Sequence, residues 1–235
     1  NDINYLDIGV RINCGADIAQ DGSINFYLPF DKKHFSFDDT LGEKIATSDA
    51  LISAVFNAEL DTRKASEQNS YHDLNFSDEA EGAIRFFTHI KPENSHIADT
   101  VTINSESSGD LEGSVITFPN SLFTHDPNKN IDSYFRFRII LLDNALKNII
   151  TVHTPSFRAV TNNHEVSEIV DFRVNEIRNL PKRIKKLAGK NTDNRIKVLH
   201  YFLIRESRVE FKFSHRDYRR TRVLEPELWA KYLGL

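Results

Sequence analysis

Hydrophobic and polar residues alternate along several segments of the chain, and this pattern predicts half-buried β-strands. In residues 6–12 every second side chain is apolar, and those between are polar or glycine. The same alternation recurs in 24–30 and in 134–141. Because successive side chains of a strand point to opposite faces of a sheet, each segment would place its apolar side chains in a core. The pattern is typical of antiparallel sheets with one covered face.

Further strand-like segments complete the predicted sheet. They lie at 84–90, 100–106, 114–119, 148–154, 167–176, 196–204 and 209–213. The segment 196–204 is apolar on both faces, so we expect it in the middle of a sheet. Residues 61–80 are polar and aperiodic, and they predict a long exposed loop.

Three segments have the apolar spacing and the end signals of helices. Ser48 can cap the first, whose apolar stripe lies within 51–60. Pro181 lies in the first turn of the second helix and Gly189 closes it, while Pro226 begins the third. About ten strands and about three helices predict the α+β class with mostly antiparallel β-sheet.

The composition is that of an ordinary soluble globular protein, with 40% hydrophobic and 27% charged residues. Cys14 is the one cysteine, which excludes an internal disulfide and a cysteine-based zinc cluster. No apolar run has the length of a membrane span, and residues 1–10 have neither the basic flank nor the apolar stretch of a signal peptide. We therefore expect a soluble, cytoplasmic protein with no membrane partner.

Charge divides the chain into two parts of opposite sign. Residues 1–130 contain 9 Lys and Arg against 22 Asp and Glu, whereas residues 131–235 contain 21 against 12. The sign changes within 119–132, a segment rich in Asn, Asp and Pro that is a plausible boundary. We predict an acidic β-rich half with one helix at 1–125 and a basic α+β half at 126–235. One continuous domain is the alternative.

The basic residues of the second half form three clusters that predict a surface for polyanions. Arginine can bind phosphate through two parallel N–H donors, and tyrosines between the arginines can stack on unpaired bases. The expected phosphate contacts are Arg136, Arg138, Lys182, Arg183, Lys185, Lys186, Arg216, Arg219, Arg220 and Arg222, with Tyr134 and Tyr218 as stacking residues. Two other interpretations stay open: a solvated helix face, and ion pairs with the acidic half.

A second pattern, E-x-K on a strand, is used by metal-dependent nucleases. Glu210 and Lys212 would project from one face of the strand, and Asp193 or Asp171 would supply another carboxylate. The acids would hold a divalent cation such as Mg²⁺ against the scissile phosphate, and the lysine would stabilise the developing charge. A cross-strand surface ion pair is the simpler explanation of this pattern, which we prefer to the nuclease site. Outside this alternative we expect no cofactor and no metal.

Several enzyme classes are disfavoured by motifs that the sequence lacks. It contains neither the G-x-G-x-x-G nor the G-x-x-x-x-G-K-[ST] phosphate loop, no G-x-S-x-G elbow and no H-E-x-x-H spacing. We therefore expect a binding or regulatory module for a nucleic acid or another phosphate-bearing ligand, in preference to an enzyme. The alternatives are a metal-dependent phosphodiesterase, and a protein-interaction subunit whose two halves or two copies dock through opposite charge.

Overall fold

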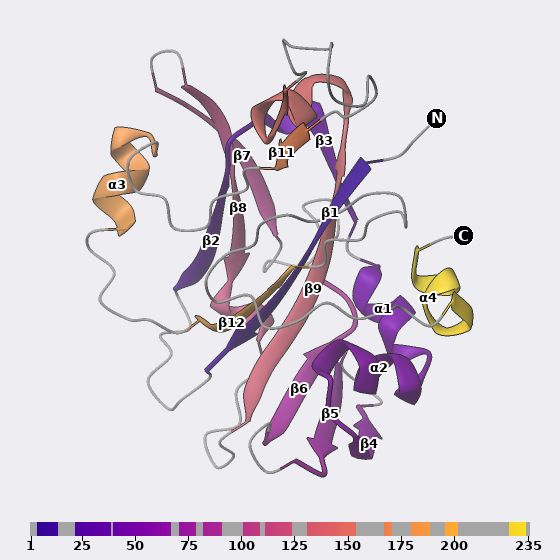
Figure 1. The fold of residues 1–235 in the computed structure, drawn as a ribbon. Coiled ribbons are helices and arrows are strands. Elements are labelled where there is room, and N and C mark those ends of the chain that lie inside the picture. Colours follow the sequence, from indigo (N-terminus) through magenta and orange to yellow (C-terminus); the bar gives the residue numbers. More distant parts are fainter. Residues whose placement is uncertain are drawn as a thin grey trace, which may run out of the picture.

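The computed structural model describes residues 4–13, 22–38, 40–66, 71–78, 82–90, 101–108, 111–123, 131–153, 167–170, 180–188, 196–201 and 226–233. Within these ranges it contains twelve strands in three sheets and four α-helices (Figure 1). All the described strand pairs are antiparallel except one. The predicted α+β class with mostly antiparallel sheet is therefore confirmed.

The elements follow one another in an order that alternates between the sheets. The strands are β1 (Asn4–Ile12), β2 (Ser23–Leu28), β3 (Phe35–Asp38), β4 (Leu60–Ala65), β5 (Tyr71–Phe76), β6 (Ala83–Phe87), β7 (Thr102–Ser108), β8 (Leu111–Pro119), β9 (Asp132–Leu141), β10 (Ile150–His153), β11 (Ser167–Val170) and β12 (Ile196–Tyr201). The α-helices are α1 (Leu41–Ala46), α2 (Asp49–Phe56), α3 (Lys182–Ala188) and α4 (Pro226–Leu233), and the 3₁₀ helices are η1 (Lys32–His34), η2 (Asn120–Leu122) and η3 (Asp143–Asn148).

The largest sheet is built around β9 in the order β12-β1-β9-β6-β5-β4. β1 pairs antiparallel with β9 along its length, and β3 and β6 share the other edge of β9. The β6–β9 pair is the parallel one. This sheet takes strands from both sides of residue 125, and the division of the chain into halves there stays a prediction.

One face of the large sheet packs against the smaller sheet β2-β8-β7. Phenylalanines dominate this core, as the alternation in β2 and β9 predicts. The ring centroid of Phe118 on β8 lies 4.9 Å from that of Phe135 and 5.2 Å from that of Phe137 on β9. Phe26 on β2 meets Phe137 edge to face at 5.6 Å. Such aromatic pairs add to the stabilisation that burial alone gives.

The opposite face of the large sheet is covered by α1, α2 and α4 (Figure 1). Ser48 caps α2 as predicted, since its hydroxyl accepts a hydrogen bond of 3.3 Å from the Leu51 amide. The helix ends at Asn57, whose φ of 54° is left-handed. The predicted apolar stripe of α2 faces this second core, where the ring of Phe56 lies 4.7 Å from that of Tyr134. The central part of the large sheet is therefore covered on both faces.

The region after α2 corrects one prediction. Residues 61–80 are not one long loop, because β4 and β5 form a hairpin there and Leu60 belongs to β4 instead of α2. β4 lies at the end of the described sheet, and its residues after Leu60 are all exposed. An edge strand with both faces in solvent has no apolar alternation, so the pattern could not reveal it.

The segments expected in the second half agree with the structure as far as it describes them. α3 begins directly after Pro181, whose carbonyl accepts a hydrogen bond from the Lys185 amide at 3.0 Å. β12 begins where predicted, but within the described residues it is the last strand of the large sheet and not a middle strand as expected. The next expected strand, 209–213, lies outside the described residues. α4 begins at Pro226, as predicted.

Candidate functional site

The face of the large sheet that α4 covers carries a cluster of buried polar side chains. Arg136 and Arg138 reach it from β9, Asp7 from β1 and Tyr232 from α4. Asp7 lies directly opposite Arg138 in the antiparallel register. Successive side chains of a strand point to opposite faces of a sheet. Phe137 points into the phenylalanine core, so Arg136 and Arg138 on either side of it point toward α4.

Hydrogen bonds join this cluster into one network. Arg138 donates to both carboxylate oxygens of Asp7, from Nε to Oδ1 at 2.7 Å and from a terminal nitrogen to Oδ2 at 3.0 Å. The Tyr232 hydroxyl donates to Oδ2 of Asp7 at 2.8 Å and accepts from Arg136 at 3.0 Å. Arg136 also donates to the Tyr134 hydroxyl at 3.1 Å. Tyr232 therefore links Arg136 to the Arg138–Asp7 ion pair. This ion pair is bidentate, and bidentate arginine–carboxylate pairs are stronger than pairs with a single hydrogen bond.

Burial determines the electrostatics of the cluster. It raises the pKa of Tyr232 far above that of an ordinary tyrosine and also raises the pKa of Tyr134, so both phenols stay protonated at neutral pH. Burial acts to lower the pKa of Arg138, but the hydrogen bond and the charge of Asp7 outweigh it, and the pKa rises. The cluster consequently holds fixed charges and neutral hydroxyls, and none of these phenols serves as a base at neutral pH.

The expectation that Tyr134, Arg136 and Arg138 lie on an open surface is wrong. These residues are 0%, 1% and 6% exposed. Tyr134 packs against Phe56 and Phe86, with ring centroids 4.7 and 5.7 Å away. Polar residues alternating with apolar ones predict solvent on the polar face, but here helices cover that face too. Arg138 instead makes the ion pair with the acidic half that the alternative interpretation predicts.

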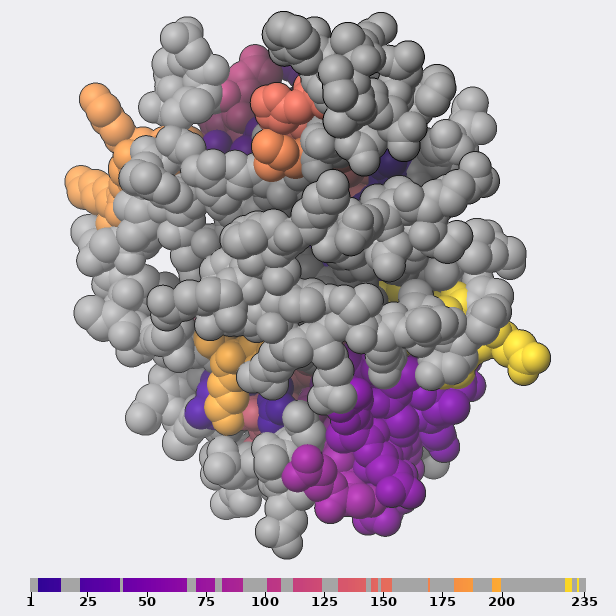
Figure 2. Space-filling model, in the orientation of Figure 1, coloured from indigo at the N-terminus to yellow at the C-terminus, as the bar shows by residue number. Residues whose placement is uncertain are grey.

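The second predicted cluster, on α3, is accessible. Lys182, Arg183 and Lys186 are exposed and Lys185 is half-buried. Arg183 donates to Glu106 on β7 at 3.1 Å, yet its side chain remains 75% exposed. α3 lies at the periphery beside the smaller sheet, and Figure 2 shows its side chains projecting from the surface. The structure therefore gathers four cations on one short helix.

The remaining predicted site residues do not add to this surface in the part that is described. α3 and α4 lie on opposite sides of the molecule (Figure 1), and the buried arginines contact α4. Outside the described residues lie Arg216, Tyr218, Arg219, Arg220, Arg222, Glu210, Lys212, Asp193 and Asp171. Within the described ranges, no group of three or more His, Cys, Asp or Glu side chains is arranged to hold a metal ion.

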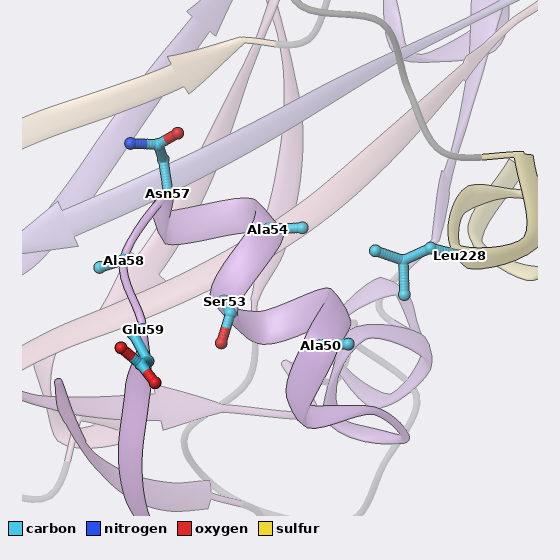
Figure 3. A pocket seen from close by; sticks show the side chains of 7 residues that line it. All are labelled: Ala50, Ser53, Ala54, Asn57, Ala58, Glu59 and Leu228. Carbon is cyan, nitrogen blue, oxygen red and sulfur yellow. The ribbon is translucent and has the colours of Figure 1, made fainter. Parts of the chain in front are cut away.

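An open depression of about 440 Å³ lies between α2 and α4 (Figure 3). Ala50 and Ala54 face Leu228 across it, while the Ser53 hydroxyl and the Glu59 carboxylate, which also line it, point away from Leu228 (Figure 3). Asn57 and Ala58 complete the lining. Ligand sites combine apolar walls with polar groups that converge on one point, and this depression lacks such convergence.

Two members of the buried network were not identified from the sequence as site residues. Asp7 is simply a polar position in an alternating strand, and Tyr232 belongs to the apolar stripe of the last helix. They are 225 positions apart, and their contact depends on the strand register and on where α4 docks. No local sequence signal relates them.

Comparison with protein-family models, with curated proteins and with solved structures finds no match to this chain. Among the described helices, none is both long enough and apolar enough to cross a membrane.

Proposed function

We propose that this protein is a binding or regulatory module that recognises a nucleic acid or another phosphate-bearing ligand through a basic surface of its C-terminal half. The observation that carries the proposal is the concentration of Lys182, Arg183, Lys185 and Lys186 on α3, with three of the four exposed. Each phosphate that a cation neutralises releases counterions, so several cations on one helix give a cumulative gain in affinity.

The geometry of α3 suits this role. Lys182 and Lys186 are four positions apart, so they share one face of the helix. Neither forms an ion pair with a described acidic residue. In the Arg183–Glu106 pair the arginine side chain is 75% exposed and the Glu106 side chain only 11%, so Arg183 would contact a phosphate from its exposed side while keeping Glu106. The arginines between 216 and 222 would extend the surface, which stays a prediction.

A salt titration tests the proposal. Binding of fluorescent single- and double-stranded oligonucleotides should weaken steeply as salt rises. The double variant Lys182→Ala, Lys186→Ala should bind more weakly and lower the slope of log affinity against log salt by about two for duplex DNA. Lys64→Ala with Lys147→Ala removes two exposed charges elsewhere and serves as the control. No binding at low salt, or equal losses in the two double variants, would refute the proposal.

The metal-dependent phosphodiesterase is the alternative for the same ligand class. It would use Glu210 and Lys212 with Asp193 or Asp171, and a divalent metal such as Mg²⁺. Incubation with DNA and RNA in Mg²⁺ or Mn²⁺ distinguishes it from simple binding. Cleavage that is lost in Glu210→Gln would support it, and cleavage that persists in this variant would exclude the assignment.

The protein-interaction subunit is supported by a different observation. Arg138 pairs with Asp7 and Arg183 with Glu106, so basic residues of the second half pair with acidic residues of the first. The same complementarity between two copies would give a salt-sensitive dimer. Size-exclusion chromatography at low and at high salt tests this, because a single salt-independent monomer peak contradicts docking between copies.

A further inference from the structure

The contacts of α4 place one phenol between two buried guanidinium groups. The Tyr232 hydroxyl lies 3.0 Å from a terminal nitrogen of Arg136 and 2.8 Å from the Asp7 oxygen that Arg138 also contacts. The guanidinium carbons of Arg136 and Arg138 lie 5.8 and 5.6 Å from the ring centroid of Tyr232. α4 therefore supplies both the ring that covers the arginines and a hydroxyl that bonds to Arg136.

Among the side chains of α4 that the structure describes, two aromatic rings attach the helix to the second core. Among its described side chains, Trp229 and Tyr232 are buried, Leu228 is half-buried and Glu227 is exposed. The apolar area that two aromatic rings bury gives a gain of the same order as the cost of ordering an eight-residue helix. When two such terms nearly cancel, the hydrogen bonds of a single hydroxyl shift the balance between a docked and an undocked helix.

We infer that α4 is a removable cover over the Arg136–Arg138 pair, held closed by the Tyr232 hydroxyl, and that the uncovered pair binds phosphate groups. Displacement of α4 takes away the phenol that accepts from Arg136, and a phosphate oxygen can accept in its place through a stronger, charge-assisted hydrogen bond. A ligand that binds only the open state shifts the equilibrium toward it. The inference rests on the proposed function for the ligand class, and it adds a means of regulation.

Hydrogen exchange of the full chain, followed by mass spectrometry, tests the cover. We expect the amides of α4 to exchange through local opening, faster than those of β9. Tyr232→Phe keeps the ring and removes the hydroxyl, so it should speed exchange in α4 about five- to tenfold and leave β9 unchanged. Tyr71→Phe makes the same change in β5 and should leave α4 unaffected. Equal exchange rates in α4 and β9 of the natural chain would overturn the inference.

Inorganic phosphate tests the ligand part. At constant ionic strength, replacing chloride by phosphate should speed exchange in α4 and not in β9, because phosphate binds the open state. An unchanged α4 rate would overturn binding at the arginine pair. These measurements need neither an oligonucleotide nor the α3 variants. Failure of nucleic-acid binding at α3 is therefore distinguishable from failure of the cover.

Discussion

Tyr232 in the last helix donates a hydrogen bond of 2.8 Å to Asp7 in the first strand, across 225 positions of sequence. Asp7 also accepts two hydrogen bonds from the Arg138 guanidinium, so one carboxylate holds β9 and α4 together on the same face of the sheet. The stability of this face should therefore depend on Asp7 more than on exposed acidic residues.

Replacing Asp7 by Asn should lower the free energy of unfolding by about 3–5 kcal/mol, because it leaves the buried Arg138 without its carboxylate partner. Denaturant unfolding measures this difference. Asp49 is a matched control, since it also pairs with an arginine, Arg63, at 2.8 Å, but its side chain is 67% exposed. Asp49→Asn should cost less than about 1 kcal/mol. Equal losses in the two variants would contradict the structural role assigned to Asp7.

Gly42→Ala should destabilise the protein by about 1–3 kcal/mol or more. A Cβ atom at this position would lie 2.6 Å from the Phe87 carbonyl oxygen and 2.7 Å from that of Thr88, so α1 would have to move away from the end of β6. In Gly113→Ala the new Cβ meets the outer end of the Tyr27 side chain, which can rotate away. Thermal unfolding should therefore show a larger loss for Gly42→Ala, and the reverse order would disprove this packing.

His72 should make the protein less stable at acidic pH. Burial, together with the charge of Arg63, lowers the pKa of His72 below its usual 6.5, and its Nδ1 accepts a hydrogen bond from Arg63. As pH falls below 6.5, His72 takes up a proton in the unfolded chain before it does so in the folded one. The free energy of unfolding therefore decreases with falling pH, and this decrease ends once pH is below the folded pKa of His72. Denaturant unfolding between pH 5 and pH 8 measures this window. In His72→Gln the free energy of unfolding should decrease less over this pH range. An identical decrease in the variant would show that other groups cause the pH dependence.

Ser48→Ala should cost about 1 kcal/mol, because the amide of Leu51 loses the hydroxyl that caps α2. Thr40 precedes α1 but makes no side-chain cap hydrogen bond, so it offers a comparison at a neighbouring helix start. Its hydroxyl donates instead to the Asp38 carboxylate in an exposed position. Chemical denaturation should show a smaller loss for Thr40→Ala than for Ser48→Ala.

Local patterns predicted those elements whose burial is one-sided and regular. The alternation in β1, β2 and β9 placed their apolar side chains in the phenylalanine core, and Ser48 marked the start of α2. The β4–β5 hairpin was missed because β4 is an exposed edge strand.

The residues of the candidate site likewise fall into those whose exposure the sequence predicted and those whose burial it did not. The exposed cations of α3 could be predicted, because Pro181 and Gly189 mark the two ends of this helix in the sequence. The burial of Arg136 could not be predicted, because it depends on a second layer that is distant in sequence. A polar face indicates solvent only where no other element covers it, and alternation within one strand carries no information about such a layer.

The central position of β9 has a consequence for the growing chain on the ribosome. β1, β3 and β6 all find their partner in residues 132–141, which are synthesised after every one of them. Until those residues emerge from the exit tunnel, three earlier strands present unpaired edges that other chains can bind. The nascent protein should therefore depend on chaperones up to that point, because β1, β3 and the β4–β5–β6 unit can join one sheet only when β9 is available.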